Sequence, residues 1–233
     1  MHWIASSLTR LCPPSRCELC GGPTWGSDCL CDDCSDDLPH INTSCDCCGR
    51  QMHENGRCGD CLKSAPAIHK TVTAYQYRYP LDILVKKYKY NQQLAIARPL
   101  ANKLSRAILN RIEGELPEVM IPIPLHYKRQ YRRGFNQSLE ICRELNRVVR
   151  VPVDYRLAER NLDTAPMYEL SPLQRKGNIR GAFRLRKPCT YQSVVIVDDI
   201  ITTGATANEL ARLLLSAGVE YVELWALARA ESQ

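Results

Sequence analysis

Apolar residues recur at helical spacing in the C-terminal two thirds of the chain. Leu100, Leu104, Ile108 and Ile112 follow a period of about 3.6 residues and predict a helix over residues 94–113. Similar patterns predict further helices over residues 80–91, 136–149 and 206–217.

Short runs rich in β-branched residues lie between these helices. Residues 194–197 read Val-Val-Ile-Val, which is apolar on both faces and typical of a strand buried inside a parallel sheet. Further strands are expected over residues 70–77, 118–124, 151–155 and 221–228. Because strands and helices alternate, we expect right-handed crossovers and a doubly wound α/β sheet.

The first quarter of the chain has a different composition. It shows little helical periodicity, and eleven of the thirteen cysteines lie between Cys12 and Cys61. We therefore place a boundary between Cys61 and Thr71 and expect two domains, a cysteine-rich module over residues 1–66 and an α/β domain over residues 67–233.

The cysteines form a repeat of C-x2-C pairs, two of which are followed by glycine (Gly21 and Gly49) where a knuckle turn needs positive φ. Four thiolates at this spacing give tetrahedral Zn²⁺ coordination and leave no open position, so we expect two structural zinc ions in a double zinc ribbon. The favoured ligand sets are Cys17, Cys20, Cys31 and Cys34 for one ion and Cys45, Cys48, Cys58 and Cys61 for the other.

Other metal assignments remain open at this point. Cys12, Cys29 and Cys47 are spare thiols that can substitute, and a pairing crossed between the repeats is an alternative. An iron–sulfur cluster is the runner-up to zinc.

The strand expected over residues 193–198 ends at Asp198 and is followed by Asp199 and a short polar turn with one glycine, Gly204. Ligands of open α/β sheets bind at the carboxyl ends of strands, and a helix N-terminus can hold phosphate. Two carboxylates beside a phosphate-binding turn suit the hydroxyls of a phosphorylated ribose, or a hydrated Mg²⁺. The alternative is an ordinary strand–turn–helix with a solvated acidic turn.

The segment over residues 125–137 is basic. It carries Lys128, Arg129, Arg132 and Arg133 with no acid among them, and we expect a loop at the same sheet edge that clamps a diphosphate. The alternative is a solvated basic loop. Asn136 is a good N-cap for the following helix. His126 is expected at the surface, and Cys142 in the core.

The formal net charge is +6, which suits phosphate-bearing partners without requiring them. The sequence has no apolar stretch of bilayer-spanning length, so we expect no membrane insertion and a cytoplasmic location.

Residues 194–206 resemble the fingerprint of type I phosphoribosyltransferases, which binds 5-phosphoribosyl-1-diphosphate (PRPP). The resemblance implies that Asp198 and Asp199 hold the ribose 2- and 3-hydroxyls. It also implies that the 5-phosphate is held by Thr202, Thr203, Gly204, Ala205 and Thr206.

The order of motifs over nearly the whole chain is similar to that of the ComF/GntX family of competence-related, phosphoribosyltransferase-like proteins. The matching segments are the cysteine pairs, Lys89 and residues 121–125, 132–138, 175–178 and 182–183. Together with the basic segment, this resemblance gives a diphosphate group of Leu125, Arg129, Arg132, Arg133 and Lys89. Met167 stands where the family often has Gln, which puts that position's role in doubt.

Two functions follow from these expectations. The first is a phosphoribosyltransferase that uses PRPP with Mg²⁺ and an acceptor of nucleobase type. The second is a non-catalytic protein that keeps the PRPP fold and handles nucleic acid. The family implies a role in uptake or use of external DNA, with DNA-uptake or recombination proteins as partners. We expect single-stranded DNA to bind Lys and Arg of the N-terminal half and of residues 125–137. A third reading makes the ribbon a hood over the PRPP site.

Overall fold

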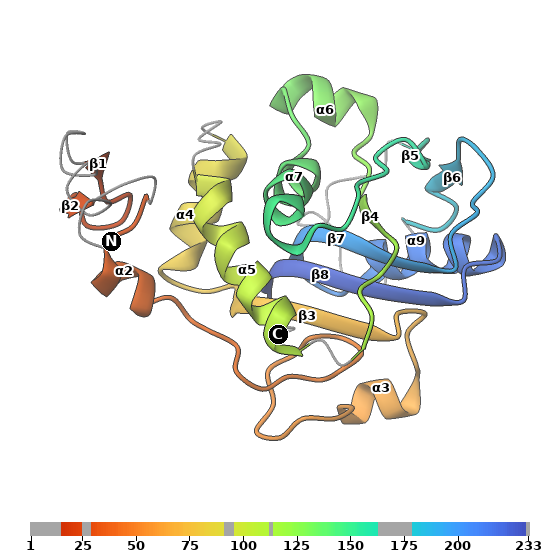
Figure 1. Ribbon diagram of the computed structural model, residues 1–233, viewed down its shortest axis with the longest axis horizontal. Coiled ribbons are helices and arrows are strands. Elements are labelled where there is room, and N and C mark those ends of the chain that lie inside the picture. Colours follow the sequence, from red (N-terminus) through yellow and green to blue (C-terminus); the bar gives the residue numbers. More distant parts are fainter. Residues whose placement is uncertain (1–14, 25–28, 91–95, 112–113, 163–178, 232–233) are drawn as a thin grey trace, which may run out of the picture.

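The computed structural model describes residues 15–24, 29–90, 96–111, 114–162 and 179–231 (Figure 1). Its centre is a four-stranded sheet in the order β3–β8–β7–β4, and every neighbouring pair is parallel. The strands are β3 (Lys70–Gln76), β4 (Val119–Pro122), β7 (Ser193–Ile201) and β8 (Tyr221–Arg229). The parallel α/β sheet expected from the sequence is confirmed.

Helices cover both faces of this sheet. The helices α4 (Leu81–Tyr90), α5 (Ala97–Arg111) and α7 (Gln137–Val149) pack on one face, in a core that includes Leu104, Val195 and Trp225. Helix α9 (Ala205–Ser216) packs on the other face against Ile196 and Leu224. The alternation of buried side chains along β7 explains this arrangement, because successive residues of a strand point to opposite faces. The two-stranded ribbon of β5 (Ala158–Arg160) and β6 (Phe183–Leu185) also joins the α9 side.

Three local expectations differ from the structure. Strand β7 continues past Asp198 to Ile201 because Ile200 and Ile201 still pair with β8. The strand expected over residues 151–155 is reduced to a single bridge between Val153 and Met120, next to a proline that cannot donate to the ladder. Residues 125–137 are not simply a loop, because they contain helix α6 (Tyr127–Arg133), which ends at Gly134 with φ of 78°.

The cysteine-rich module contains only short elements. They are β1 (Ser15–Arg16), β2 (Pro23–Thr24), α2 (Asp32–Asp36) and α3 (Gly59–Lys63). Its metal-binding knuckles and connecting turns, not a large apolar core, give the module its shape.

This module covers the free edge of the sheet. Ile41 donates its backbone N–H to Ala74, Gln76 donates to the carbonyl of residue 39, and Thr71 donates to Asp46. These bonds satisfy the outer side of β3, which as an edge strand would otherwise expose unpaired backbone groups. The boundary near residue 66 remains our proposal. Among the described helices, none is long and apolar enough to cross a membrane.

Candidate functional site

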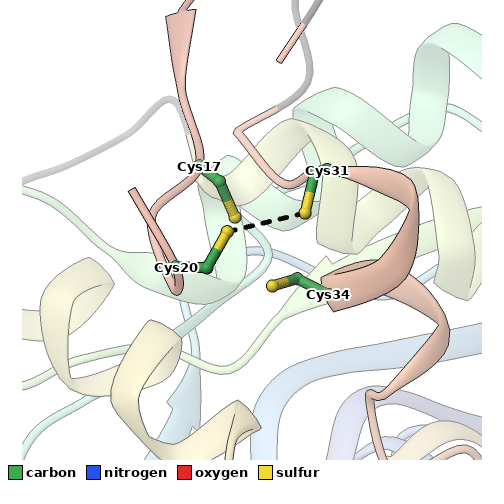
Figure 2. Close-up of side chains that lie close together, drawn as sticks. All are labelled: Cys17, Cys20, Cys31 and Cys34. Carbon is green, nitrogen blue, oxygen red and sulfur yellow. Dashed lines mark hydrogen bonds between the residues drawn. The ribbon is translucent and has the colours of Figure 1, made fainter. Parts of the chain in front are cut away.

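Four cysteine thiols converge in the first half of the module (Figure 2). Cys17 and Cys20 come from the turn between β1 and β2, and Cys31 and Cys34 from the start of α2. The sulfur atoms of all four lie within 4.8 Å of one another, with Cys20 and Cys31 Sγ 3.7 Å apart.

The second repeat builds a matching group from Cys45, Cys48, Cys58 and Cys61, again within 4.8 Å. Here Cys48 and Cys58 Sγ are 3.7 Å apart. Both groups follow the pairing within each repeat, not the crossed one. Cys29 and Cys47 belong to neither group in the described residues, and Cys12 lies outside those residues.

Each group fits a structural zinc ion. Four sulfur donors from two C-x2-C knuckles match the tetrahedral donor set that Zn²⁺ prefers. Gly21 and Gly49 have φ of 74° and 68°, as expected for the turn after each knuckle. At Gly49 a side chain has no room either, because a Cβ atom would lie 2.8 Å from Thr71 Cγ2 on β3.

Two adjacent carboxylates lie at the carboxyl end of β7, one of the two central strands. Asp198 Oδ1 accepts hydrogen bonds from the backbone N–H of Asp199 at 2.8 Å and from Ser138 Oγ at 3.3 Å. Asp199 Oδ1 accepts from the backbone N–H of Ile200 at 2.7 Å. Short backbone bonds hold both side chains at the strand end.

One lysine faces this acidic pair. Lys89 Nζ, from the last turn of α4, lies 2.9 Å from Asp199 Oδ2. The two side chains are only 19% and 12% exposed, so the ion pair is largely removed from water. The sequence groups Lys89 with the expected diphosphate residues, whereas the structure places it against Asp199, one of the two acids expected to bind ribose.

Among the described residues, Asp199 forms its ion pair with Lys89, which leaves Asp198 held by hydrogen bonds. The pKa of Asp198 is raised to about 7, because burial and the neighbouring Asp199 charge outweigh the hydrogen bonds and the Lys89 charge, which lower it. Lys89 keeps a raised pKa despite its burial, because the Asp199 charge favours the ammonium form. Groups that donate hydrogen bonds or positive charge are the ligands that relieve this arrangement.

Residues 202–206 turn the chain from β7 into α9. Gly204 is the N-cap of α9 with φ of 74°, a left-handed conformation that suits glycine. Thr203 Oγ1 accepts from the backbone N–H of Ala205 at 3.3 Å. Thr202 is exposed, and the other four residues of the turn are half-buried. The turn thus presents hydroxyls and the amides of a helix N-terminus, a combination that binds phosphate.

The basic residues lie on α6, beyond the carboxyl end of β4, which runs parallel to β7. They therefore lie toward the carboxyl ends of the parallel strands, as do the acids and the turn. Lys128 and Arg132 are exposed, while Arg129, Arg133 and the preceding Leu125 are half-buried. Arg133 Nη1 donates to Gln137 Oε1 at 3.1 Å.

Two contacts hold the start of α7, directly after α6. Asn136 caps α7, as expected, by accepting from the N–H groups of Ser138 and Leu139, and its amide donates to the Ile123 carbonyl at 3.0 Å. Tyr88 of α4 donates its hydroxyl to the Gln137 carbonyl at 3.0 Å. Its neighbour Lys89 is thereby fixed near the acids.

Other expectations had mixed outcomes. Cys142 is fully buried in the α7 core, as expected, and burial raises its thiol pKa well above the ordinary value. The surface position expected for His126 is wrong, because that residue is 5% exposed and its ring lies 4.4 Å from that of Tyr127. Met167 and residues 175–178 lie outside the described residues.

Sequence reasoning missed Arg229, at the end of β8. It is 5% exposed and donates to the carbonyls of Ile201, Thr202 and Ala230, and through Nε to the Cys48 carbonyl at 2.9 Å. One buried guanidinium thus connects the second cysteine group to the start of the turn over residues 202–206. The only sequence signal was a charged residue closing an apolar strand.

Comparisons with known proteins agree with both parts of the chain. The phosphoribosyl transferase domain family matches residues 97–233, and the double zinc ribbon domain family matches residues 8–62. A hypoxanthine-guanine phosphoribosyltransferase from Bacillus anthracis is a structural match with 17% identity and a TM-score of 0.36, covering 57% of this chain and 68% of its own.

Curated relatives match over almost the whole chain. DNA utilization protein YhgH of Escherichia coli (strain K12) is 37% identical over 224 residues, covering 93% of this chain and 97% of its own. Competence protein F of Haemophilus influenzae is 35% identical over 223 residues, covering 92% and 97%. Competence protein ComFC of Bacillus subtilis is 23% identical over 205 residues, covering 81% and 79%. The chain belongs to the family of DNA utilization protein YhgH and competence protein F, in which a double zinc ribbon precedes a phosphoribosyltransferase domain.

Proposed function

We propose that the chain binds PRPP, or ribose 5-phosphate, at residues 198–206 and serves the uptake or use of external DNA. One observation carries the first part. Two adjacent carboxylates, one of them paired with Lys89, lie near the carboxyl end of a central parallel strand, and a left-handed glycine then caps the N-terminus of the next helix. The names of the relatives carry the second part.

Each ligand group has a counterpart in the site. Ribose hydroxyls donate hydrogen bonds to Asp198 and Asp199, and this stabilises the ionised form of Asp198. The 5-phosphate accepts from the turn over residues 202–206, where the helix dipole adds to the attraction. Arg129, Arg132 and Arg133 of α6 suit the diphosphate, because guanidinium groups bind phosphate oxygens in a fork.

A divalent cation fits this arrangement. Carboxylate oxygens and phosphates are the ligands that Mg²⁺ prefers, and Asp198 and Asp199 supply the protein oxygens. Mg²⁺ bound with PRPP would supply positive charge to the departing diphosphate. The zinc ions, each enclosed by four thiols, have a structural role in this proposal.

The proposal has a catalytic and a non-catalytic form. In the catalytic form, the bond between C1 of the ribose and the diphosphate breaks, and a nucleobase nitrogen attaches to C1. In the non-catalytic form, PRPP is bound and not consumed, and the domain acts as a scaffold for handling DNA.

Diphosphate release separates the two forms. The zinc-loaded chain is incubated with PRPP, Mg²⁺ and each of a panel of nucleobases, and released diphosphate is measured beside calorimetric PRPP binding. Base-dependent release that is lost in Asp199→Asn supports the transferase. Binding without release for any base supports the scaffold, and absence of both rejects PRPP as the ligand.

A further inference from the structure

A polar cavity lies far from residues 198–206. It has a volume of about 980 Å³ and is bounded by the segment between the two cysteine groups, the start of β3 and the second half of α5. Tyr221, which opens β8, lines it and pairs with Ser193 at the start of β7. Asp198 is five residues further along β7, roughly 17 Å at the rise of a strand. The two sites therefore lie toward opposite ends of the same parallel strands.

The lining of this cavity, here called the basic groove, is strongly cationic. It contains Arg57, Lys70, Lys103, Arg106 and Arg111, against one carboxylate, Asp46. Such an imbalance in a concave, partly desolvated surface concentrates positive potential.

Two of these cations are held in place by neutral groups. Arg111 donates to Ser44 Oγ at 2.6 Å and to the Asn42 carbonyl at 3.0 Å, and Lys70 Nζ donates to the Arg111 carbonyl at 2.6 Å. Lys103 and Arg106 form no ion pair with any described residue. Among the described residues, the lining of the groove therefore carries more positive than negative charge.

Two of the cations and one amide side chain lie on the same face of α5. Lys103, Arg106 and Asn110 are spaced three and four residues apart, so they form a row along the helix. This row spans about 10 Å at 1.5 Å per residue. A row of cations suits a ligand with repeated phosphates better than one with a single phosphate group.

A smaller cavity of about 180 Å³ continues the groove toward the first cysteine group and shares Lys103 and Arg106. Tyr75 lines it, is fully buried, and has a hydroxyl without a hydrogen-bond partner among the described residues. A buried polar group is normally satisfied, so this hydroxyl has room in the cavity wall for a polar partner, either a water molecule or a polar atom of a ligand.

Aromatic rings stand at the other end of the groove. The rings of His69 and Tyr221 are 4.9 Å apart, and both residues are exposed. Bases of single strands stack on such rings, whereas a duplex keeps its bases paired and stacked inside.

We propose that the basic groove binds single-stranded nucleic acid, with phosphates along Lys103 and Arg106 and a base against Tyr221. This gives the DNA-handling part of the proposed function a site and rests on that part alone. It does not depend on PRPP binding.

The test measures fluorescence anisotropy of a labelled 15-nucleotide oligo(dT) with the full zinc-loaded chain at several salt concentrations. The groove variant is Lys103→Gln with Arg106→Gln. The matched control is Arg143→Gln with Arg147→Gln, which removes two equally positive, exposed charges from α7. Zinc content, melting temperature and PRPP binding of both variants are measured in parallel.

Wild type is expected to bind, and the groove variant to bind at least tenfold more weakly at 100 mM salt. Its slope of log affinity against log salt should be shallower by about 1.4, the contribution of two phosphates on a single strand. The control variant should stay within about twofold of wild type. Tyr221→Leu should weaken binding with the salt slope unchanged, because it removes stacking and no charge.

Several results would overturn the proposal. They are no binding by wild type at 50 mM salt, equal losses in the groove and control variants, or equally tight binding of duplex DNA. Equally tight, groove-dependent binding of polyglutamate would assign the groove to an acidic protein partner instead. Oligonucleotide binding without PRPP binding supports this inference and rejects the PRPP proposal. PRPP binding without oligonucleotide binding supports the PRPP proposal and rejects this inference.

Discussion

Replacing Asp198 by Asn should stabilise the unliganded protein at high pH while it weakens ligand binding. The amide is close to isosteric with the carboxyl, and its oxygen can still accept from Asp199 N–H and Ser138 Oγ. The substitution therefore removes a charge and keeps the local hydrogen bonds. In the proposed function, the charge that lowers stability at this position is the same charge that binds the ligand.

The magnitude follows from the pKa of Asp198, which is about 7 in the folded protein against about 3.9 for an unperturbed Asp. The folded chain binds the proton more tightly than the unfolded chain, so stability falls as pH rises from about 4 to 7 and is then level. Between pH 5 and pH 8 this linkage amounts to about 2–3 kcal/mol. For a chain of this size, the corresponding change in melting temperature is about 5–10 °C.

Urea unfolding at pH 5, 6, 7 and 8 in Mg²⁺-free buffer measures this difference. Fluorescence of Trp225, which is fully buried in β8, reports on the sheet. Relative to wild type, Asp198→Asn should gain stability steadily up to pH 7, whereas Glu220→Gln, an exposed control, should show no such trend. If the free energies of unfolding of wild type and Asp198→Asn change with pH in the same way, the claim that ionisation of Asp198 destabilises the folded protein is refuted.

Further predictions concern the two four-cysteine groups, Arg229 and the turn over residues 202–206. Cys48→Ser should lower bound zinc from about two ions per chain to about one and destabilise the module, because metal binding there contributes to the free energy of folding. The control Cys142→Ser should keep both ions. Elemental analysis that finds no zinc in wild type, or iron with sulfide, would contradict this prediction. Arg229→Met should lower the free energy of unfolding by about 2–3 kcal/mol, because it leaves buried carbonyls without a hydrogen-bond donor, and it should weaken PRPP binding. Urea unfolding identical to that of wild type would contradict a structural role for this guanidinium. Gly204→Val should lower both stability and binding, because a β-branched residue is strained at φ of 74°, and the comparison of melting temperature and PRPP calorimetry checks both.

The parts of the fold that sequence predicts are those with local signals. The apolar run at residues 194–197, the helical spacing around Leu104 and the N-cap at Asn136 each depend on a few neighbouring residues, and the structure has all three elements. The cysteine spacing likewise predicted two four-thiol groups, because a C-x2-C knuckle is a local turn.

Long-range contacts explain what was missed. The ion pair of Lys89 with Asp199 joins residues 110 positions apart, and the bond of Arg229 to the Cys48 carbonyl joins residues 181 positions apart. No local pattern specifies such partners. The helix α6 was missed because Tyr127 and Tyr131 are exposed, so its sequence lacks the apolar stripe that packing gives to most helices.

The central claim is that residues 198–206 bind PRPP. Calorimetric titration with PRPP and Mg²⁺ compares wild type, Asp198→Asn with Asp199→Asn, and a control with Glu144→Gln and Glu220→Gln that loses the same charge. A charged hydrogen bond contributes about 1.5–3 kcal/mol, so the Asn variant should bind at least about tenfold more weakly, and the control should bind like wild type. Wild type that fails to bind at millimolar PRPP, or an Asn variant that binds equally well, would contradict the account.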